Sequence, residues 1–367
     1  MFQRSVVTFF FVSAVAFCTA QNSAVVHPPK LTPQLSGTTQ LLIAVSPVNS
    51  QIVWAAGTGG TYVVTTDGGA TWNSGVVPGA ENLQFRDVQG VSDKVAYLMS
   101  IGDSTTDFRI YKTFDGGSTW HLQFVNHTAS AFYDCFAFWA PNRGIAHSDS
   151  VNGTFPDVRT FSGQRWHSIS GSMPPALPGE ASFSSSGTCI TTQGDSNAWI
   201  TTGGSTLSRV LATTDAGDTW NAYDTPLISS PSAGGLSIAF RDAMHGIVGG
   251  GDLAVNYRIQ AATSDDGGHT WTLTKKPPLG GTIFGLAYAK GMTLENSGNT
   301  DPAFERTVVI TAEDAPNFDK GAAAWSPDEG QTWYRLSNAS GYWAVGFANP
   351  HAGWFVGNNG QILKISF

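Results

Sequence analysis

Charged side chains are scarce in this chain. Asp, Glu, Lys and Arg together make up 13% of its 367 residues, about half the share found in an average soluble protein. The net charge is −8, and the sequence contains no run of basic residues. A chain of this kind offers no basic surface to nucleic acid or to anionic lipid. We therefore expect neither of these partners.

Cysteine is equally rare, with Cys18, Cys135 and Cys189 as the only three. Together with the histidines they form no zinc-ligand spacing. The Gly-rich stretch 57–60 is a turn between strands and lacks the helix that a dinucleotide site requires. We therefore expect no metal and no cofactor. A disulfide between Cys135 and Cys189 stays open, because spacing alone cannot place two Cα atoms within bonding range.

Long apolar runs are also missing beyond the N-terminus. Residues 1–20 combine Arg4 with an apolar stretch too short to span a bilayer and with small residues before Gln21, a pattern typical of a secretory signal peptide. Phe17 disfavours lipid attachment at Cys18 because it is bulky. We expect cleavage after Ala20, no membrane insertion, and a secreted or periplasmic protein.

What the sequence does contain is an internal repeat. The pattern [ST]-x-D-x-G-x-T-W occurs at 65–72, 113–120, 213–220, 264–271 and 326–333. Its aspartates and tryptophans are Asp67 and Trp72, Asp115 and Trp120, Asp215 and Trp220, Asp266 and Trp271, and Asp328 and Trp333. A degenerate copy has Phe161 in place of Asp and keeps Gly163 and Trp166. Repetition near 50 residues is typical of propellers and solenoids.

Each position of the repeat has a local structural role. The Asp carboxylate is expected to accept bonds from backbone N–H groups two and three residues later, and Gly permits a positive φ. The Trp begins the next strand and buries its indole. We therefore interpret these aspartates as structural turn residues rather than as ligands, and we call the five motifs the Asp turns.

Four short strands fit between successive turns, which predicts an all-β, seven-bladed β-propeller. The blades are expected near 39–80, 81–128, 129–176, 177–228, 229–278, 279–338 and 339–367. The last blade has only three strands, so an N-terminal arm at 21–38 is expected to close the ring, with residues near 31–40 beside the final strand.

The innermost strands can be aligned on one small residue each. This alignment groups Ala44, Asp87, Ala137, Cys189, Ala239, Ala287 and Gly346. Small side chains suit the crowding near a common axis. Asp87 is the exception, and its carboxylate is expected to face the water of the central channel.

The repeats resemble the Asp-box, or BNR, repeat, and the whole mature chain looks like the photosystem II stability/assembly factor-like family. Sialidase and sortilin-type propellers are more distantly similar. The resemblance implies a non-catalytic binding or assembly propeller with an unknown ligand. A carbohydrate-active enzyme, either a glycoside hydrolase or a sialidase-like protein, is the alternative. The sialidase Phe-Arg-x-Pro motif is absent, since 85–88 reads FRDV.

The candidate site is the channel mouth on the face opposite the Asp turns, where loops are free to carry function. Its polar residues are Arg86, Tyr133, Asp134, His147, Asp149, Glu180, Asp252, Tyr257 and Asp314. An enzyme would use the carboxylates of Asp134, Asp149 and Glu180. We expect a protein or glycan ligand at this mouth and a monomeric chain.

Overall fold

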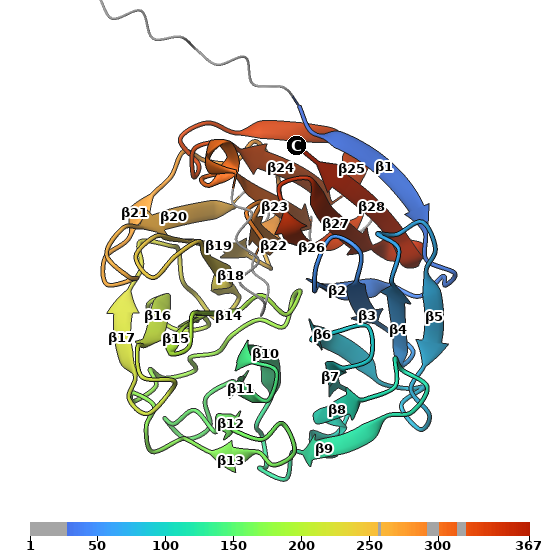
Figure 1. Ribbon diagram of the computed structural model, residues 1–367. Coiled ribbons are helices and arrows are strands. Elements are labelled where there is room, and N and C mark those ends of the chain that lie inside the picture. The colour runs from blue at the N-terminus through green and yellow to red at the C-terminus, as the bar shows by residue number, and fades with distance from the viewer. Residues whose placement is uncertain (1–27, 256–257, 292–300, 314–320) are drawn as a thin grey trace, which may run out of the picture.

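The computed structural model describes residues 28–255, 258–291, 301–313 and 321–367. These residues form seven four-stranded antiparallel sheets, arranged as blades around a central axis (Figure 1). The predicted seven-bladed β-propeller is confirmed. The signal peptide expected at 1–20 lies outside the described residues.

In each blade the strands run from the axis outwards in chain order, except in the last blade. The innermost strands are β2 (Leu42–Pro47), β6 (Gln84–Gly90), β10 (Tyr133–Ala140), β14 (Ile190–Gln193), β18 (Ala233–Phe240), β22 (Thr282–Tyr288) and β26 (Tyr342–Asn349). The second strands are β3 (Val53–Gly57), β7 (Ala96–Ile101), β11 (Arg143–Ser148), β15 (Asn197–Thr201), β19 (Gly246–Asp252), β23 (Val308–Glu313) and β27 (Ala352–Gly357).

The third strands are β4 (Thr61–Thr65), β8 (Arg109–Thr113), β12 (Val158–Thr160), β16 (Arg209–Thr213), β20 (Gln260–Ser264), β24 (Ala322–Ser326) and β28 (Gln361–Ser366). The outermost strands are β5 (Asn73–Val76), β9 (His121–Val125), β13 (His167–Ser168), β17 (Asn221–Asp224), β21 (Thr272–Leu273), β25 (Tyr334–Ser340) and β1 (Lys30–Leu35). Three short 3₁₀ turns are also present: η1 (Thr105–Asp107), η2 (Pro302–Phe304) and η4 (Asn358–Gly360).

The hydrophobic core lies between neighbouring blades. Trp54, Trp199 and Trp354 stand at matching positions of their second strands and are fully buried. Trp199 stacks on Phe240 of the next blade with 3.6 Å between ring centroids. Burial of such large rings stabilises each blade-to-blade contact through the hydrophobic effect.

The Asp turns share one hydrogen-bond pattern. In the first turn, Asp67 Oδ1 accepts from the Thr71 N–H at 2.9 Å, and Oδ2 accepts from Thr71 Oγ1 at 2.6 Å. Thr65 Oγ1 accepts from the N–H groups of Asp67 and Gly69. The expectation that the carboxylate binds N–H groups two and three residues later was therefore only partly right for this turn, since Ala70, three residues on, contributes a weaker bond. The threonine hydroxyl takes the nearer donors, and the carboxylate reaches the fourth residue.

These bonds favour the ionised carboxylate, and those from Thr71 contribute most. They lower the pKa of Asp67 to about 2. In the degenerate copy, Thr160 Oγ1 still accepts from the Gly163 N–H at 2.9 Å, and the turn is kept without its Asp. The aspartates are thus bonded to their own turns, which agrees with their interpretation as structural residues.

The two ends of the described chain meet in the last blade. Strand β1 pairs antiparallel with β28, from Lys30 opposite Ser366 to Leu35 opposite Gln361. Gln34 Oε1 also accepts from the indole N–H groups of Trp72 at 3.1 Å and of Trp354 at 3.2 Å. The predicted closure by the N-terminal arm is confirmed, with the strand at 30–35.

We predict that deletion of residues 21–38 lowers the melting temperature sharply and promotes aggregation. The deletion removes β1 and leaves the backbone groups of β28 as an open sheet edge. The matched control is a deletion of residues 21–27, which ends before β1 and should melt like the wild type. Equal melting curves for the two deletions, measured by circular dichroism, would contradict this account of closure.

Candidate ligand site at the channel mouth

Six of the seven innermost strands carry a β-bulge near their first residues. The residues skipped by the pairing register are Ile43, Arg86, Asp134, Leu236, Phe284 and Trp343. A bulged residue is unpaired, and bulges redirect side chains next to functional sites. Four of the six, Ile43, Leu236, Phe284 and Trp343, pack in one apolar cluster. We call the six residues the bulge ring.

The bulges also correct the sequence alignment of the innermost strands. Ala44 and Asp87 directly follow their bulged residues. Ala137, Ala239, Ala287 and Gly346 instead lie three residues beyond theirs. The equivalent residues in the first two blades are therefore Ser46 and Gln89. The alignment of those two blades was wrong by two residues, because a bulge changes the register without changing the residue types.

Asp87 does not stand in channel water as expected. Its side chain is buried, Oδ2 accepts from the Phe136 N–H of the next blade at 2.8 Å, and Oδ1 accepts from the Val88 N–H at 2.7 Å. Burial raises the pKa of Asp87 well above its ordinary value. The carboxyl group therefore joins two innermost strands, a structural role.

Blade 4 has no bulge and a short innermost strand, because the chain before β14 enters the channel instead. In Figure 1 this segment reaches towards the axis from the β13–β14 connection. We call residues 182–188 the plug. The carbonyl oxygen of Ser184 accepts from Arg86 Nη1 at 3.2 Å, and the hydroxyls of Thr188 and Ser237 lie 2.7 Å apart. The plug thus bonds to blades on opposite sides of the channel.

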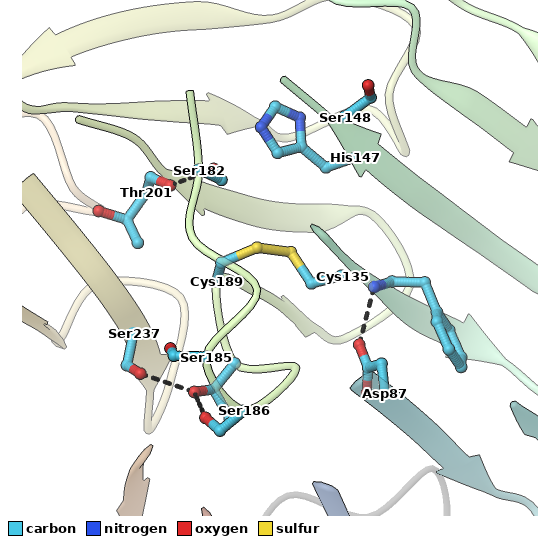
Figure 2. Close-up of a disulfide and its surroundings, with 12 residues drawn as sticks. Asp87, Cys135, His147, Ser148, Ser182, Ser185, Ser186, Cys189, Thr201 and Ser237 are labelled. Atoms are coloured by element: carbon cyan, nitrogen blue, oxygen red, sulfur yellow. Dashed lines mark hydrogen bonds between the residues drawn. A yellow bond between two sulfur atoms is a disulfide. The ribbon is translucent and has the colours of Figure 1, made fainter. Parts of the chain in front are cut away.

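A disulfide fastens the end of the plug. Cys135 of β10 is bonded to Cys189, which directly precedes β14, and their Cα atoms are 6.0 Å apart (Figure 2). Both cysteines are buried. The pairing left open by the sequence is thereby established, and it holds the plug against the neighbouring blade.

Above the plug lies a cavity of about 360 Å³ at the face opposite the Asp turns. Its apolar wall consists of Phe132, Phe183, Leu236, Leu253, Phe284 and Trp343. Its polar wall consists of Arg86, Asp134, Asp149, Ser182, Ser184 and Ser185. Five of the six bulge-ring residues therefore line this cavity, which is the channel mouth.

Two carboxyl groups of the polar wall interact directly. Asp149 Oδ1 accepts from the Ser182 N–H of the plug at 2.9 Å. Burial raises the pKa of Asp134 well above its ordinary value, and the charge of Asp149 raises it further. Burial also raises the pKa of Asp149. Adjacent carboxyl groups do not both ionise readily, and the interaction with Asp149 favours the protonated form of Asp134.

Arg86 is the cationic group of the mouth. Its Nη2 donates to Gln84 Oε1 at 2.9 Å, and its guanidinium lies 5.7 Å from the centre of the Trp343 ring. Burial lowers the pKa of Arg86 to about 10. Within the described residues its Nε is buried and has no hydrogen-bond partner. The guanidinium is therefore held by Gln84 and the plug, with one buried donor left unpaired.

Four of the predicted mouth residues that the structure describes do not line this cavity. Tyr133 is buried and donates to the Pro156 carbonyl at 2.7 Å. His147 is buried with Nδ1 2.8 Å from Asp157 Oδ2. Assigning these two to the mouth was wrong. Tyr133 points away from its neighbour Asp134 because successive side chains on a strand alternate, and His147 is bonded to the buried Asp157.

Glu180 is the third misplaced residue. It is buried, and its Oε1 accepts from Arg209 Nε at 2.9 Å and from Thr202 Oγ1 at 2.7 Å.

Asp252 lies at the end of β19. Its carboxylate accepts hydrogen bonds from Ser232 Oγ and from the Ala254 N–H, both at 2.9 Å, and orders its own loop. Tyr257 and Asp314 lie outside the described residues.

The sequence analysis missed the apolar half of the mouth. Polar loop residues do not reveal this half, since Leu236, Phe284 and Trp343 resemble ordinary strand residues. One feature of the sequence could have identified them, because each lies near the start of an innermost strand.

Among the described residues no three His, Cys, Asp or Glu side chains group as metal ligands. No described helix is long and apolar enough to cross a membrane.

We predict that Asp134→Asn stabilises the protein at pH 8 and has little effect at pH 4. The folded-state pKa of Asp134 is raised, so the wild type loses stability as pH rises above the unfolded value near 4. Asn remains neutral and can still donate to Asp149. The melting temperature, measured from pH 4 to pH 8, should exceed that of the wild type by a few degrees at the alkaline end. The exposed Asp103→Asn is the control, and a parallel profile for both variants would refute a protonated Asp134.

Solved structures with a similar fold include two of YCF48. One, bound to a D1 peptide, has a TM-score of 0.62 and 17% identity over 94% of this chain and 99% of that chain. YCF48 from Cyanidioschyzon merolae has a TM-score of 0.63 and 16% identity, covering 92% and 98%. The GH74 xyloglucanase from Xanthomonas campestris has a TM-score of 0.59 and 15% identity, covering 91% of this chain and 53% of that chain. No protein-family model and no curated protein sequence matches. These likenesses show a shared fold.

Proposed function

We propose that this protein is a non-catalytic propeller that binds a segment of another protein at the channel mouth. The observation that carries the proposal is the bulge ring, which builds a cavity with one apolar and one polar wall above the plug. A cavity of this kind, with a few convergent polar groups, is the usual form of a ligand site. The YCF48 structure bound to a D1 peptide supports the proposal, because a propeller of similar fold binds a peptide.

The cavity suggests how a peptide would be held. Its volume of about 360 Å³ lies near the small end of the range of about 300–1,000 Å³ for ligand pockets. One large apolar side chain would enter against Phe284, Leu236 and Trp343, and the rest of the peptide would lie across the face. Arg86 would donate to a peptide carbonyl, which would pair its buried donor.

We further propose that the protein acts as a monomer outside the cytoplasm. Disulfides persist in oxidising compartments, and the bridge from Cys135 to Cys189 fits the signal-peptide pattern of the N-terminus.

A glycoside hydrolase is the second candidate, and the similar fold of the GH74 xyloglucanase favours it. The carboxyl groups weigh against it. Glycosidases hold two carboxyl groups about 5 Å or more apart, so that the sugar lies between them. Asp134 and Asp149 instead interact directly, and Glu180 is tied to Arg209. The binding function is therefore the better supported of the two.

We predict that Leu253→Asp weakens peptide binding at the mouth at least tenfold. Leu253 is part of the apolar wall and is followed by loop residues, so the change adds a charge to the cavity with little effect on the blades. Peptides would be selected from a displayed random library on the wild type, and their affinities would be measured by fluorescence anisotropy. Selected peptides should share a large apolar residue.

The control is Phe114→Asp, which replaces an exposed apolar residue within an Asp turn. It should bind the selected peptides like the wild type. Failure to select any peptide, or equal loss in both variants, would contradict the proposal. Release of sugar from xyloglucan by the wild type, abolished by Asp134→Asn, would favour the hydrolase.

A further inference from the structure

A second cavity opens on the Asp-turn face, between blades 5 and 6. Its volume is about 440 Å³, larger than that of the mouth. It is lined by Arg241, His245, Thr263, Ser264, Asp265, Thr270, Thr272, Arg306 and Glu329. These residues come from the β18–β19 turn, from β20 and β21, from two Asp turns and from the segment before β23. No aromatic or aliphatic residue takes part in the wall.

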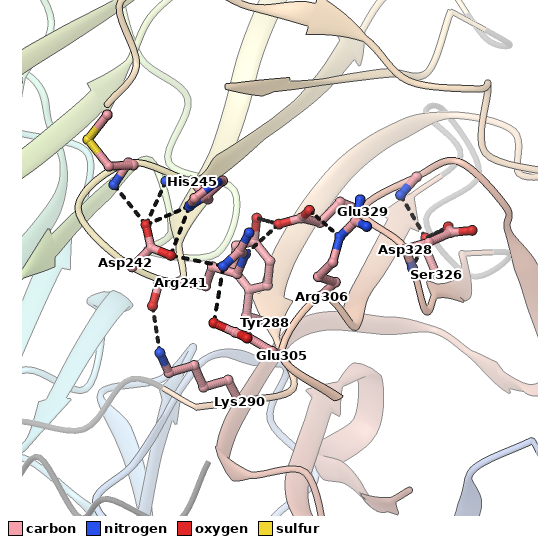
Figure 3. Close-up of polar contacts among 12 residues, drawn as sticks. Arg241, Asp242, His245, Tyr288, Lys290, Glu305, Arg306, Ser326, Asp328 and Glu329 are labelled. Carbon is pink, nitrogen blue, oxygen red and sulfur yellow. Dashed lines mark hydrogen bonds and ion pairs between the residues drawn. The ribbon is translucent and has the colours of Figure 1, made fainter. Parts of the chain in front are cut away.

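Glu329 anchors the inner wall of this cavity (Figure 3). Its Oε1 accepts from Arg241 Nε at 2.7 Å and from the Tyr288 hydroxyl at 3.0 Å, and its Oε2 accepts from Arg306 Nε at 2.8 Å. One carboxylate therefore orients two guanidinium groups. Within the described residues, the Nη groups of Arg306 make no hydrogen bond and are free to donate.

The internal repeat shows that this arrangement is not needed for the fold. Glu329 has φ 54°, and the same left-handed position in the other Asp turns holds Gly68, Gly116, Ala216 and Gly267. Four turns thus form with small residues there, and glycine suits this conformation better than Glu does. An unfavourable residue kept in a strained position points to a role at a site.

Arg241 is equally specific to its blade. It lies five residues beyond the bulged residue Leu236. The other bulged strands have Val48, Val91, Trp139, Ala289 and Ala348 at this spacing. Five blades therefore fold with an apolar residue where blade 5 has a half-buried arginine. Its Nη1 pairs with Asp242 at 2.9 Å and with Glu305 at 3.1 Å.

Acidic groups outnumber basic ones around the cavity, and the Asp-turn carboxylates Asp266 and Asp328 add to this excess. Arg241, Arg306 and Lys290 are opposed by Asp242, Glu305, Glu329 and Asp265, as Figure 3 shows for all but Asp265. An anion would gain little from such a site. The wall nevertheless offers free donors on Arg306 together with an exposed acceptor on Asp265 and the hydroxyls of Thr263 and Thr272.

We propose that this cavity binds a small, neutral, polyhydroxylated ligand, namely a sugar. Each sugar hydroxyl both donates and accepts, so it can bond to Arg306 and Asp265 without adding charge. Planar, charge-assisted groups give the stronger of these bonds. The site is separate from the channel mouth and does not depend on the function proposed for it.

The test uses the full chain with glucose, galactose and N-acetylglucosamine as probes, and with sulfate as an anionic probe. Binding is followed by saturation-transfer difference NMR and by isothermal titration. Asp265→Thr and Glu329→Gly introduce residues that other Asp turns carry at these positions, such as Thr66 and Gly68. Both variants should keep the fold. Each should weaken sugar binding at least tenfold, while Leu253→Asp at the mouth should leave it unchanged.

Saturable binding of at least one sugar, lost in both variants, would support the site. The absence of binding for all three sugars would overturn it, as would equal binding by the wild type and Asp265→Thr. Sulfate binding that Glu329→Gly abolishes, without sugar binding, would make it an anion site instead. Should Glu329→Gly fail to fold, Asp265→Thr decides alone, because Asp265 is exposed.

Discussion

A ring of twisted sheets is complete only when its first and last strands belong to the same sheet. In this protein that condition is met by the hydrogen bonds between β1 and β28. Gln34 also joins the last blade to the first, since its side chain accepts hydrogen bonds from one tryptophan of each. Every other blade contact presupposes this one, because an open ring would expose the apolar faces that pack between neighbours.

The closed ring also determines where a ligand can be held. Seven innermost strands crowd around one axis, and a bulge in six of them places an unpaired residue at the same end of the channel. The seventh strand contributes the plug instead. Each blade supplies a different residue to the mouth. Arg86 and Asp134 belong to the polar wall, and Leu236 and Phe284, which lie opposite them, belong to the apolar wall. A symmetric scaffold thus carries an asymmetric cavity.

The Asp turns made the blade count and the closure by the N-terminal arm predictable, because Asp67 and its equivalents mark the same turn in each repeat. The site was only partly predictable. Arg86, Asp134 and Asp149 were found because they are polar and lie near strand ends. Tyr133 was misplaced although it adjoins Asp134, since a bulge decides which of two neighbours enters the channel. Glu180 was misplaced because its partner Arg209 is 29 residues away, and no local pattern shows such a pairing.

The position of β1 has a consequence for how the chain becomes folded. Gln34 and Trp354, which bond across the closure, are 320 residues apart in the sequence. Contacts between such distant segments form slowly, because the entropy of loop closure is lost before they are made. A chain made from its N-terminus must hold β1 without a partner until the last strand emerges. Strand β1 can therefore find its partner only after β28 has been made, and until then the last blade keeps an unpaired sheet edge that could pair with another chain.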